Sequence, residues 1–416
     1  MAVDISTLTA RANAGDLSVQ LELAGLYETG TGVPVDRGRA AHWYRMAAEE
    51  GVIKAQSHLG QMYIRGIGVP KDHVEAVNWL QKAAQQGNRA AQANLAWCYQ
   101  EGKGTVKDFP QAIAWYEKAA AQGHAGASYN LGYLYANGSG VPKDEQKALH
   151  WYTQAAQLGH NKAQHNLGIM YEQGAGADQD YAAAVRWYSA AASQGYARSQ
   201  YNLARLYTEG RGVEKDNQEA FKWFKQASAA GYYKAQFNLG LFYLHGLGNE
   251  QDHSQALVLF KAAAARGYPK AFYQLGKMYA NGLGVEVNEI ESAKSFQQSA
   301  DRGYVKAQYK LARLYMDGQG VRKDVAVACQ WLEKSARQGY SQAQYDLGIC
   351  YARGRGVSTD LRRAYAWLTL ADQSGVRKIT KVMKKIAESM GAAEIAEAQK
   401  LADKLRAGIS ITKEQQ

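Results

Sequence analysis

A tyrosine recurs every 36 residues along this 416-residue chain, and no insertion or deletion breaks the period across ten copies. A period of this length is typical of a solenoid, in which each repeat is one supersecondary unit that packs on the next. The period limits the possible folds more than composition does, and it favours a protein that binds other proteins over an enzyme. The ten positions are Tyr27, Tyr63, Tyr99, Tyr135, Tyr171, Tyr207, Tyr243, Tyr279, Tyr315 and Tyr351.

The second repeat shows how one unit is expected to fold. Apolar and small residues with helical spacing precede Gly66, which is placed to end a first helix in the left-handed conformation. After a short turn, Asp72 stands where the N-cap of a second helix belongs. Trp79 and Leu80 lie on the apolar face of that helix, and Gly87 ends it. The unit is therefore predicted to be two antiparallel helices joined by a short loop.

The same features recur in the other repeats. Each first helix carries glycine or alanine at the position of Gly60, where a small side chain lets a neighbouring helix approach closely. We expect the recurring tryptophans to lie in the core, so that Trp151→Ala would cost about 3–5 kcal/mol. The cap positions are Asp36, Asp72, Asp108, Asp144, Asp180, Asp216, Asp252, Asn288, Asp324 and Asp360, and the tryptophan column is Trp43, Trp79, Trp115, Trp151, Trp187, Trp223, Trp331 and Trp367.

The pattern A-Q-x-N-L-G-x-x-Y-x-x-G-x-G-V-x-x-D-x-x-x-A-x-x-W-Y-x-x-A-A-x-x-G resembles the Sel-one-like repeat, a 36-residue relative of the tetratricopeptide repeat. The C-terminal string AEIAEAQKLADKL also resembles the closing segment of many bacterial members. The resemblance implies a right-handed superhelix with the first helix of each unit on the concave side. It also implies a scaffold or adaptor role in protein complexes, in a bacterial protein.

The predicted fold is an all-α, right-handed α/α superhelical solenoid of ten 36-residue helix-turn-helix repeats with terminal capping helices. Residues 1–16 are expected to form a capping half-repeat, because Gly15 is in phase with the glycines that end the second helices. The ten repeats occupy residues 17–376, and the apolar stripes in 377–407 predict two capping helices. Residues 408–416 are expected to fray.

Charge, cysteine content and the lack of long apolar runs indicate the cellular compartment in which the protein is expected. The formal net charge is +11, and residues 301–416 contribute 21 Lys and Arg against 12 Asp and Glu. Three cysteines cannot supply a bridge to each repeat, which favours a reducing compartment. The sequence shows no signal peptide and no apolar run long enough to span a membrane, so we expect a cytoplasmic protein. We also expect it to be a monomer.

The sequence offers no catalytic or metal-binding constellation. Each Gly-x-Gly pair follows a helix and precedes a capped helix, which predicts a structural turn and not a phosphate-binding loop. Cys98, Cys329 and Cys350 share repeat positions with aliphatic residues and are expected to be inert core thiols. The nine histidines show no metal-ligand spacing, and we expect neither a metal nor a cofactor.

Repeat positions that vary while carrying large side chains are candidates for partner contact. One such column points away from the core face of the first helix and suggests a groove that is apolar and aromatic in the first half and basic in the second. Packing between adjacent first helices is the alternative. This variable column comprises Gln61, Trp97, Tyr133, Ile169, Arg205, Leu241, Lys277, Arg313 and Ile349.

Two further sets of polar residues are candidates. An asparagine column could bond an extended peptide, or it could bond neighbouring helices; it comprises Asn94, Asn130, Asn166, Asn202 and Asn238. A basic patch at the C-terminal end could be a solvated face, could steer an acidic partner protein, or could meet nucleic acid or anionic lipid. Nucleic acid is the weaker reading, because no aromatic residues interleave with these cations. The patch comprises Arg353, Arg355, Arg362, Arg363, Arg377, Lys378, Lys381, Lys384 and Lys385.

The sequence thus predicts a non-enzymatic scaffold or adaptor that binds a protein or peptide, which the basic patch suggests is acidic. By analogy with family members, the alternative is a dedicated immunity or inhibitor protein that sequesters one bacterial effector. A third hypothesis is a β-lactamase-type hydrolase, an activity linked to a cysteine-rich branch of the family. This chain lacks the paired cysteines of that branch, so we expect no turnover of a β-lactam.

Overall fold

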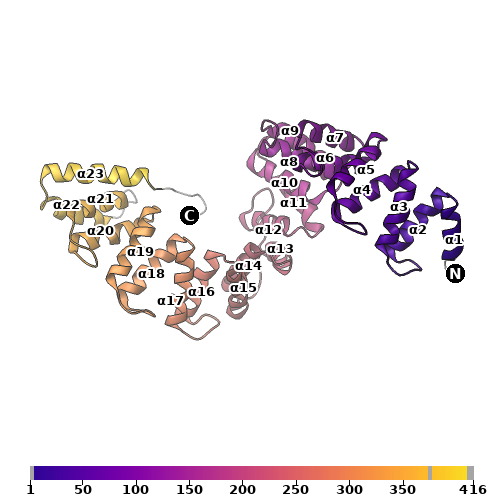
Figure 1. Cartoon of the computed structure of the whole chain (residues 1–416). Coiled ribbons are helices and arrows are strands. Elements are labelled where there is room, and N and C mark those ends of the chain that lie inside the picture. The colour runs from indigo at the N-terminus through magenta and orange to yellow at the C-terminus, as the bar shows by residue number, and fades with distance from the viewer. Residues whose placement is uncertain (1–3, 373–376, 410–416) are drawn as a thin grey trace. The chain divides into compact units, whose positions relative to one another are not determined.

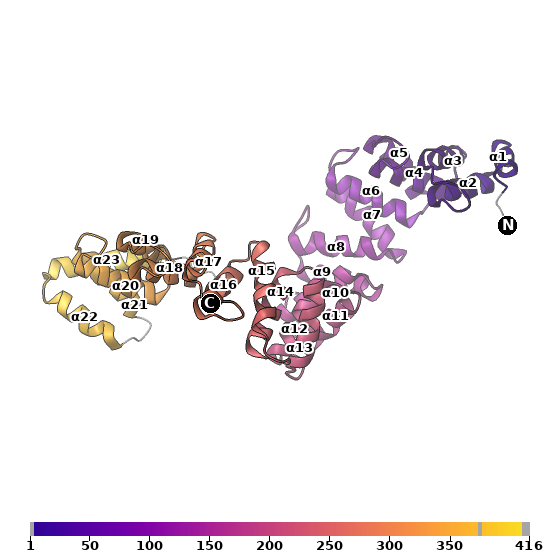
Figure 2. The same ribbon diagram turned by 90° about the horizontal axis from the view of Figure 1, so that it is seen from below.

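The computed structural model describes residues 4–372 and 377–409, and this part of the chain consists of 23 helices without a strand. Contacts divide the chain into two compact units, Met1–Lys215 and Asp216–Gln416. Within each unit, consecutive helices pack as antiparallel hairpins that follow one another along the chain (Figures 1 and 2). The predicted all-α solenoid fold is confirmed.

Unit 1 contains twelve helices within its described residues, and eleven of them are 13 residues long. The even-numbered helices are the first helices of the repeats, and the odd-numbered helices from α3 onward are the second helices. They are α1 (Ile5–Asn13), α2 (Leu17–Thr29), α3 (Arg37–Glu49), α4 (Ile53–Arg65), α5 (His73–Gln85), α6 (Arg89–Glu101), α7 (Phe109–Ala121), α8 (Ala125–Asn137), α9 (Glu145–Gln157), α10 (Asn161–Gln173), α11 (Tyr181–Ser193) and α12 (Ala197–Glu209).

Unit 2 continues the alternation and ends in two helices of a different pattern. Its predicted frayed tail, residues 408–416, lies outside the described residues from position 410 onward. The helices are α13 (Asn217–Ala229), α14 (Tyr233–His245), α15 (His253–Ala265), α16 (Pro269–Asn281), α17 (Glu289–Asp301), α18 (Val305–Asp317), α19 (Val325–Arg337), α20 (Ser341–Arg353), α21 (Leu361–Asp372), α22 (Arg377–Ala387) and α23 (Ala392–Ala407).

The helix ends form as the sequence predicts. Asp36 accepts a hydrogen bond from the Arg39 backbone N–H at 2.9 Å, and Asp144 accepts one from Lys147 at the same distance. Gly66 ends α4 with a φ of 68°, which is the left-handed conformation that glycine adopts without steric cost. The caps satisfy backbone groups that the helix itself leaves unbonded.

The residue after the tryptophan column is buried in every second helix, and it is tyrosine, phenylalanine or leucine. Tyr116, Tyr188, Phe260 and Phe296 are fully buried in that place. Their rings pack over the small residue of the first helix, and a Cβ added at Gly132 would lie 2.6 Å from the ring of Tyr152. The predicted close approach at the position of Gly60 is therefore confirmed.

The tryptophans themselves are less buried than predicted. Trp43, Trp331 and Trp367 are buried, but the expectation of a core position is wrong for five others. Because the tryptophan stands one position earlier on the helix, its indole lies toward the flank of the hairpin. In two of the five, a lysine three residues later covers the ring: the ammonium groups of Lys82 and Lys118 lie 4.3 Å and 4.2 Å from the ring centroids of Trp79 and Trp115. The half-buried members are Trp79, Trp115, Trp151, Trp187 and Trp223.

A ladder of buried glutamines joins successive repeats. In α4, Gln56 donates from Nε2 to the Ala48 carbonyl of the preceding repeat at 3.1 Å and accepts from Gln86 of its own repeat at 2.9 Å. The same bond to a carbonyl eight residues earlier is made by Gln20, Gln92, Gln164, Gln200, Gln308 and Gln344. At the first rung, Gln20 bonds the Ala12 carbonyl, so α1 takes the place of a second helix.

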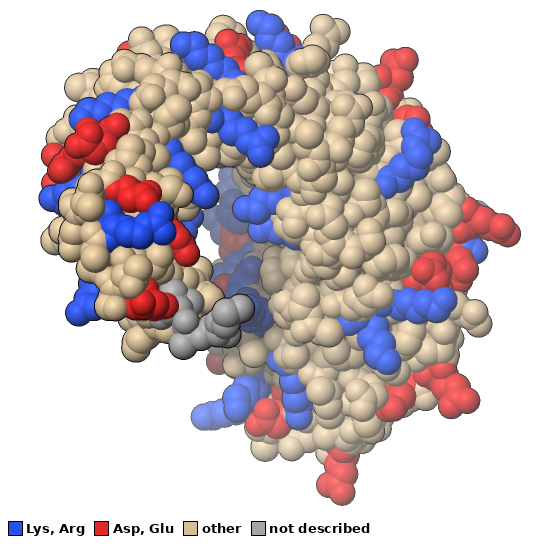
Figure 3. All heavy atoms as spheres, turned by 90° about the vertical axis from the view of Figure 1, so that its right-hand side faces the viewer, with Lys and Arg blue, Asp and Glu red and all other residues tan. Residues whose placement is uncertain are grey.

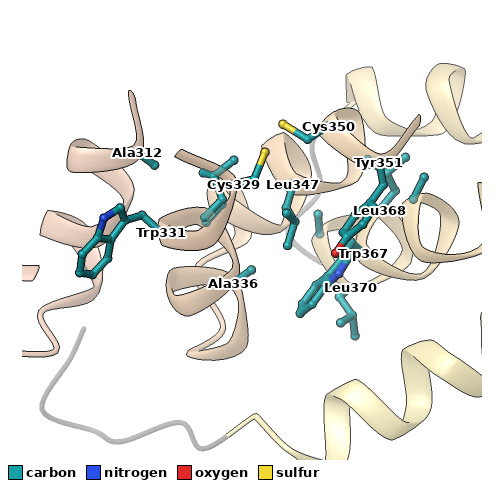
Figure 4. Packing of buried hydrophobic residues seen from close by; sticks show 14 of the residues in the cluster. Ala312, Cys329, Trp331, Ala336, Leu347, Cys350, Tyr351, Trp367, Leu368 and Leu370 are labelled. Carbon is teal, nitrogen blue, oxygen red and sulfur yellow. The ribbon is translucent and has the colours of Figure 1, made fainter. Parts of the chain in front are cut away.

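The C-terminal repeats and the closing helices share one core. Leu368 and Trp367 on α21 are buried with Leu347 and Cys350 on α20 (Figure 4). Ile379 and Ile386 of α22 are also buried in this cluster, and α23 packs on α21. The apolar face of α22 is therefore used for packing, and Lys381, Lys384 and Lys385 are exposed on its other side.

Candidate partner-binding face

Each first helix leaves one side uncovered by its second helix. In α4, the core positions such as Leu59 and Met62 are buried, whereas Lys54, Gln61 and Arg65 are partly or fully exposed. The exposed positions recur in every first helix because their spacing keeps them on one helical face. We call this side, formed by the second, sixth, ninth and thirteenth residues of each first helix, the first-helix face.

All nine members of the variable column lie on the first-helix face, at its ninth position, and none is fully buried. Tyr133 is 46% exposed, and Lys277 and Arg313 are also exposed. Trp97, Ile169, Arg205 and Leu241 are half-buried. Trp97 packs against the cores of two successive repeats, so for this residue the packing alternative holds in part.

Two hollows open on this face in unit 1. The larger, of about 370 Å³, lies between α8 and α10 and is lined by Tyr133, Asn166 and Ile169, with Tyr152 and Met170 among its other walls. The smaller, of about 270 Å³, is lined by Gln61, Ile64, Arg65, Asn94 and Trp97. The structure therefore brings members of the two predicted columns together at each hollow.

Most of the asparagine column lies beside polar groups of the protein itself. Asn130, Asn166 and Asn202 lie near the hydroxyls of Tyr116, Tyr152 and Tyr188 respectively, and burial raises the pKa of all three phenols. Asn238 donates to the Lys234 carbonyl at 2.8 Å. These four amides keep unused donors and acceptors. Asn94 lines the smaller hollow.

The arginines of the variable column are already paired with carboxylates. Arg205 contacts Glu172 of the preceding first helix and lies 3.0 Å from Glu209. Tyr188 donates to the same Glu172 at 2.9 Å. Arg313 lies 3.6 Å from Asp346, whose pKa burial raises. These pairs tie adjacent first helices together and leave the arginines with little unbalanced charge.

The aromatic residues at the fifth position of the first helices pack between repeats. The Phe237 and Tyr268 ring centroids are 5.1 Å apart, and those of Tyr273 and Tyr304 are 5.3 Å apart. Edge-to-face pairs of this kind stabilise packing beyond the area they bury. These rings therefore belong to the inter-repeat contact and do not form a free stacking surface.

The basic patch is exposed wherever its side chains are described. Arg362 lies 2.9 Å from Glu397, and Arg363 lies 3.4 Å from Asp360. The side chains of Arg377 and Lys378 lie outside the described residues. The exposed members are Arg353, Arg355, Arg362, Arg363, Lys381, Lys384 and Lys385. Figure 3 views the molecule from the side of its N-terminal helices and does not display this patch; acidic and basic side chains intermingle over the face that it shows.

The cysteines are buried as expected. Burial raises the pKa of the Cys98 thiol to about 11, so it is protonated at neutral pH and unreactive. The Cys329 thiol lies 3.2 Å from the Arg355 carbonyl oxygen, within the core shown in Figure 4. Within residues 4–372 and 377–409, no group of three His, Cys, Asp or Glu side chains is arranged to hold a metal ion. No described helix is long and apolar enough to cross a membrane.

A column of cations on the same face was not predicted. Lys162, Arg198, Lys234, Lys270 and Lys306 occupy the second position of five successive first helices, four residues before the asparagine column. These cations repeat with the same 36-residue period as the tyrosines, so the column can be found in the sequence. A search for variable positions with large side chains does not find it, because these residues belong to the face through their position on the helix.

One buried histidine makes this region sensitive to acid. His165 in α10 bonds Ser199 Oγ through Nδ1 at 2.9 Å and lies against Tyr188 and Tyr196. Burial, and to a lesser extent the nearby Arg198, lower its pKa from 6.5 to about 4. The neutral ring is therefore the form that the folded protein accommodates.

We expect folding stability to fall as the pH drops from about 6.5 toward 4, because only the unfolded chain takes up the His165 proton in that window. The loss from this residue is about 2 kcal/mol at pH 5. His165→Tyr, which supplies the residue found at this position in α8 and α12, should remove that part of the pH dependence. Urea unfolding at pH 7 and pH 5 measures it; equal pH dependence in both proteins would contradict the assignment.

Stacked helical hairpins with one uncovered face define a helical-repeat protein. The family model of the Sel1 repeat matches ten successive segments, so the chain belongs to this family. Its members generally mediate protein–protein interactions, and their scaffold is generally non-enzymatic. The matched residues are 18–52, 53–88, 89–124, 125–160, 161–196, 197–232, 234–268, 269–304, 305–340 and 341–371.

Solved structures agree with this assignment. A protective antigen of uropathogenic Escherichia coli strains, which displays an SLR fold, is 32% identical, with a TM-score of 0.86 over 96% of this chain and 86% of that chain. A Sel1 repeat protein from Oxalobacter formigenes is 31% identical, with a TM-score of 0.63 over 76% of this chain and 93% of that chain. A comparison with curated proteins gives no match.

Proposed function

We propose that this protein is a scaffold or adaptor that binds a partner protein or peptide along the first-helix face, without catalysing a reaction. The observation that carries the proposal is the hollow of about 370 Å³ between α8 and α10, with the exposed Tyr133 at its edge and Ile169 in its wall. Aromatic side chains at a partly apolar hollow are the usual anchors of protein interfaces. A monomer acting in the cytoplasm is part of the proposal.

In this proposal, the predicted residues make different kinds of contact with the partner. Tyr133 and Ile169 supply apolar contact, while the half-buried Trp97 contributes both to the smaller hollow and to packing. The asparagines supply their remaining amide groups to a bound chain. The basic patch of the last repeats and α22 is proposed to favour an acidic partner by steering its approach.

We expect Tyr133→Ala to weaken capture of the partner by about tenfold or more, as the loss of an interface anchor does. Because the ring is 46% exposed, helicity and melting temperature should stay close to those of the wild type. Affinity capture from the native cell with mass spectrometry identifies the partner, and calorimetric titration of the purified pair then measures the change in affinity.

Val106→Ala is the matched control, because it removes an apolar side chain that is 84% exposed in the loop between α6 and α7 and lines neither hollow. Its affinity should equal that of the wild type. Equal binding by the Tyr133→Ala protein would contradict the proposed location of the site, and turnover of a substrate by the purified protein would contradict a purely binding role.

A further inference from the structure

The first-helix face of unit 2 carries a row of unbalanced positive charge. Lys234, Lys270 and Lys306 stand at the second position of α14, α16 and α18, one to a repeat, and all three are partly exposed. None of the three is in an ion pair within the described part of the chain, in contrast to Arg313 on the same face. The row therefore faces solvent with its charge unneutralised.

Two neighbouring lysines add further positive charge to this face. Lys277 on α16 and Lys310 on α18 also lie on this face and are likewise without an ion pair among the described residues. The carboxylates of the face at this end, Asp317 and Asp346, are both placed against Arg313. The acidic side chains thus offset the one arginine and leave the five lysines to act on a ligand.

The surroundings of the row suit an extended peptide better than nucleic acid. The aromatic rings nearest to it are engaged between repeats, as in the pair Tyr309 and Tyr340, whose centroids are 5.2 Å apart. They are therefore not free to stack on bases, which single-stranded nucleic acid requires of such a groove. Lysine ammonium groups with one-repeat spacing match carboxylates along a chain, because each acts as a separate point charge.

We infer that the lysine row of α14, α16 and α18 is a docking site for an extended acidic segment of a partner protein. This inference deepens the proposed function and rests on it, since it names the chemistry of the partner and a second place of contact. Three adjacent first helices, roughly 8–10 Å apart, are crossed by fewer than ten extended residues, which advance about 3.3 Å each. The site is separate from the C-terminal basic patch and from the hollow at Tyr133.

A fluorescein-labelled deca-glutamate peptide tests the inference by anisotropy titration against the full chain. The variant protein is Lys234→Gln with Lys270→Gln and Lys306→Gln. We expect it to bind about tenfold more weakly, which is the summed effect of three exposed charge contacts. Binding to the wild type should also weaken as salt is raised, because exposed charges are screened.

The control variant makes the same change in net charge on the second helices. It is Lys225→Gln with Lys261→Gln and Lys294→Gln on α13, α15 and α17, where all three side chains are exposed. The control should bind within about twofold of the wild type, since distant surface charges act weakly through solvent. Circular dichroism of both variants verifies that neither has lost its helices.

Three results would overturn the inference: no binding of deca-glutamate to the wild type, equal loss in both triple variants, or equally tight lysine-dependent binding of a ten-nucleotide oligothymidylate. The first two exclude a localised acidic-peptide site, and the third assigns the row to polyanions in general. Partner capture that depends on Tyr133 would be unaffected by any of these results. A failure of the lysine row is therefore distinguishable from a failure of the proposed function.

Discussion

Tyr152→Ala is expected to destabilise the protein by about 3–5 kcal/mol, as truncation of a buried aromatic side chain does. Tyr152 is 3% exposed, packs over Gly132 and shares a core cluster with Leu167 of the next repeat. The substitution leaves a cavity in the hairpin and removes a contact with the next repeat. Urea unfolding of the full chain, followed by far-ultraviolet circular dichroism, measures the loss.

The adjacent Trp151→Ala is the matched control, and it reverses the expectation drawn from the sequence. Its indole is half-buried on the flank of the hairpin, so its removal should cost about 1–2 kcal/mol. A larger loss for Trp151→Ala than for Tyr152→Ala would contradict the packing described for these hairpins. The two residues are neighbours in sequence, so local helix propensity cannot explain a difference of this size.

Gly104→Ala is expected to cost about 2–5 kcal/mol, combining the left-handed penalty of about 1–2 with an overpacking penalty of about 1–3. Gly104 has a φ of 73°, and a Cβ there would lie 1.9 Å from the carbonyl oxygen of His73 in the preceding repeat. Backbone cannot move aside as a side-chain end can. Thermal unfolding by circular dichroism would show the loss.

Gly123→Ala isolates the conformational part of that cost. Gly123 has a φ of 75°, but a Cβ at this position meets nothing within 4 Å. The substitution should therefore cost only about 1–2 kcal/mol, the penalty for a left-handed residue with a side chain. Similar losses for the two variants would show that the contact between Gly104 and the preceding repeat has little weight.

The two helices of each repeat, and the points where they begin and end, were predictable from the sequence because they depend on local chemistry. An aspartate before a helix, such as Asp144, and a glycine after one, such as Gly66, act within a few residues of their own position. Ten in-phase copies make such local signals unmistakable. The depth of the residue after the tryptophan column was not predictable in this way, because its type varies among tyrosine, phenylalanine and leucine and gives no constant local signal.

The candidate site was predictable in outline but not in its partnerships. Helical geometry placed Tyr133 and Ile169 on the uncovered face, where the structure finds them beside a hollow. The pairing of Arg205 with Glu172 joins residues one repeat apart, and no rule of sequence spacing states which arginine will find a carboxylate. The lysines of unit 2 can be recognised as unpaired only when the structure shows which basic residues, such as Arg205, are paired.

The glutamine ladder has a consequence for how the chain can have grown. Each glutamine of the ladder donates a hydrogen bond to a main-chain carbonyl, as Gln164 does to Ala156. Every residue in every repeat carries such a carbonyl oxygen. A duplicated or recombined repeat therefore finds its bond without a matching mutation in the copy before it. Array length can change by whole units, while the groups that meet a ligand diverge independently.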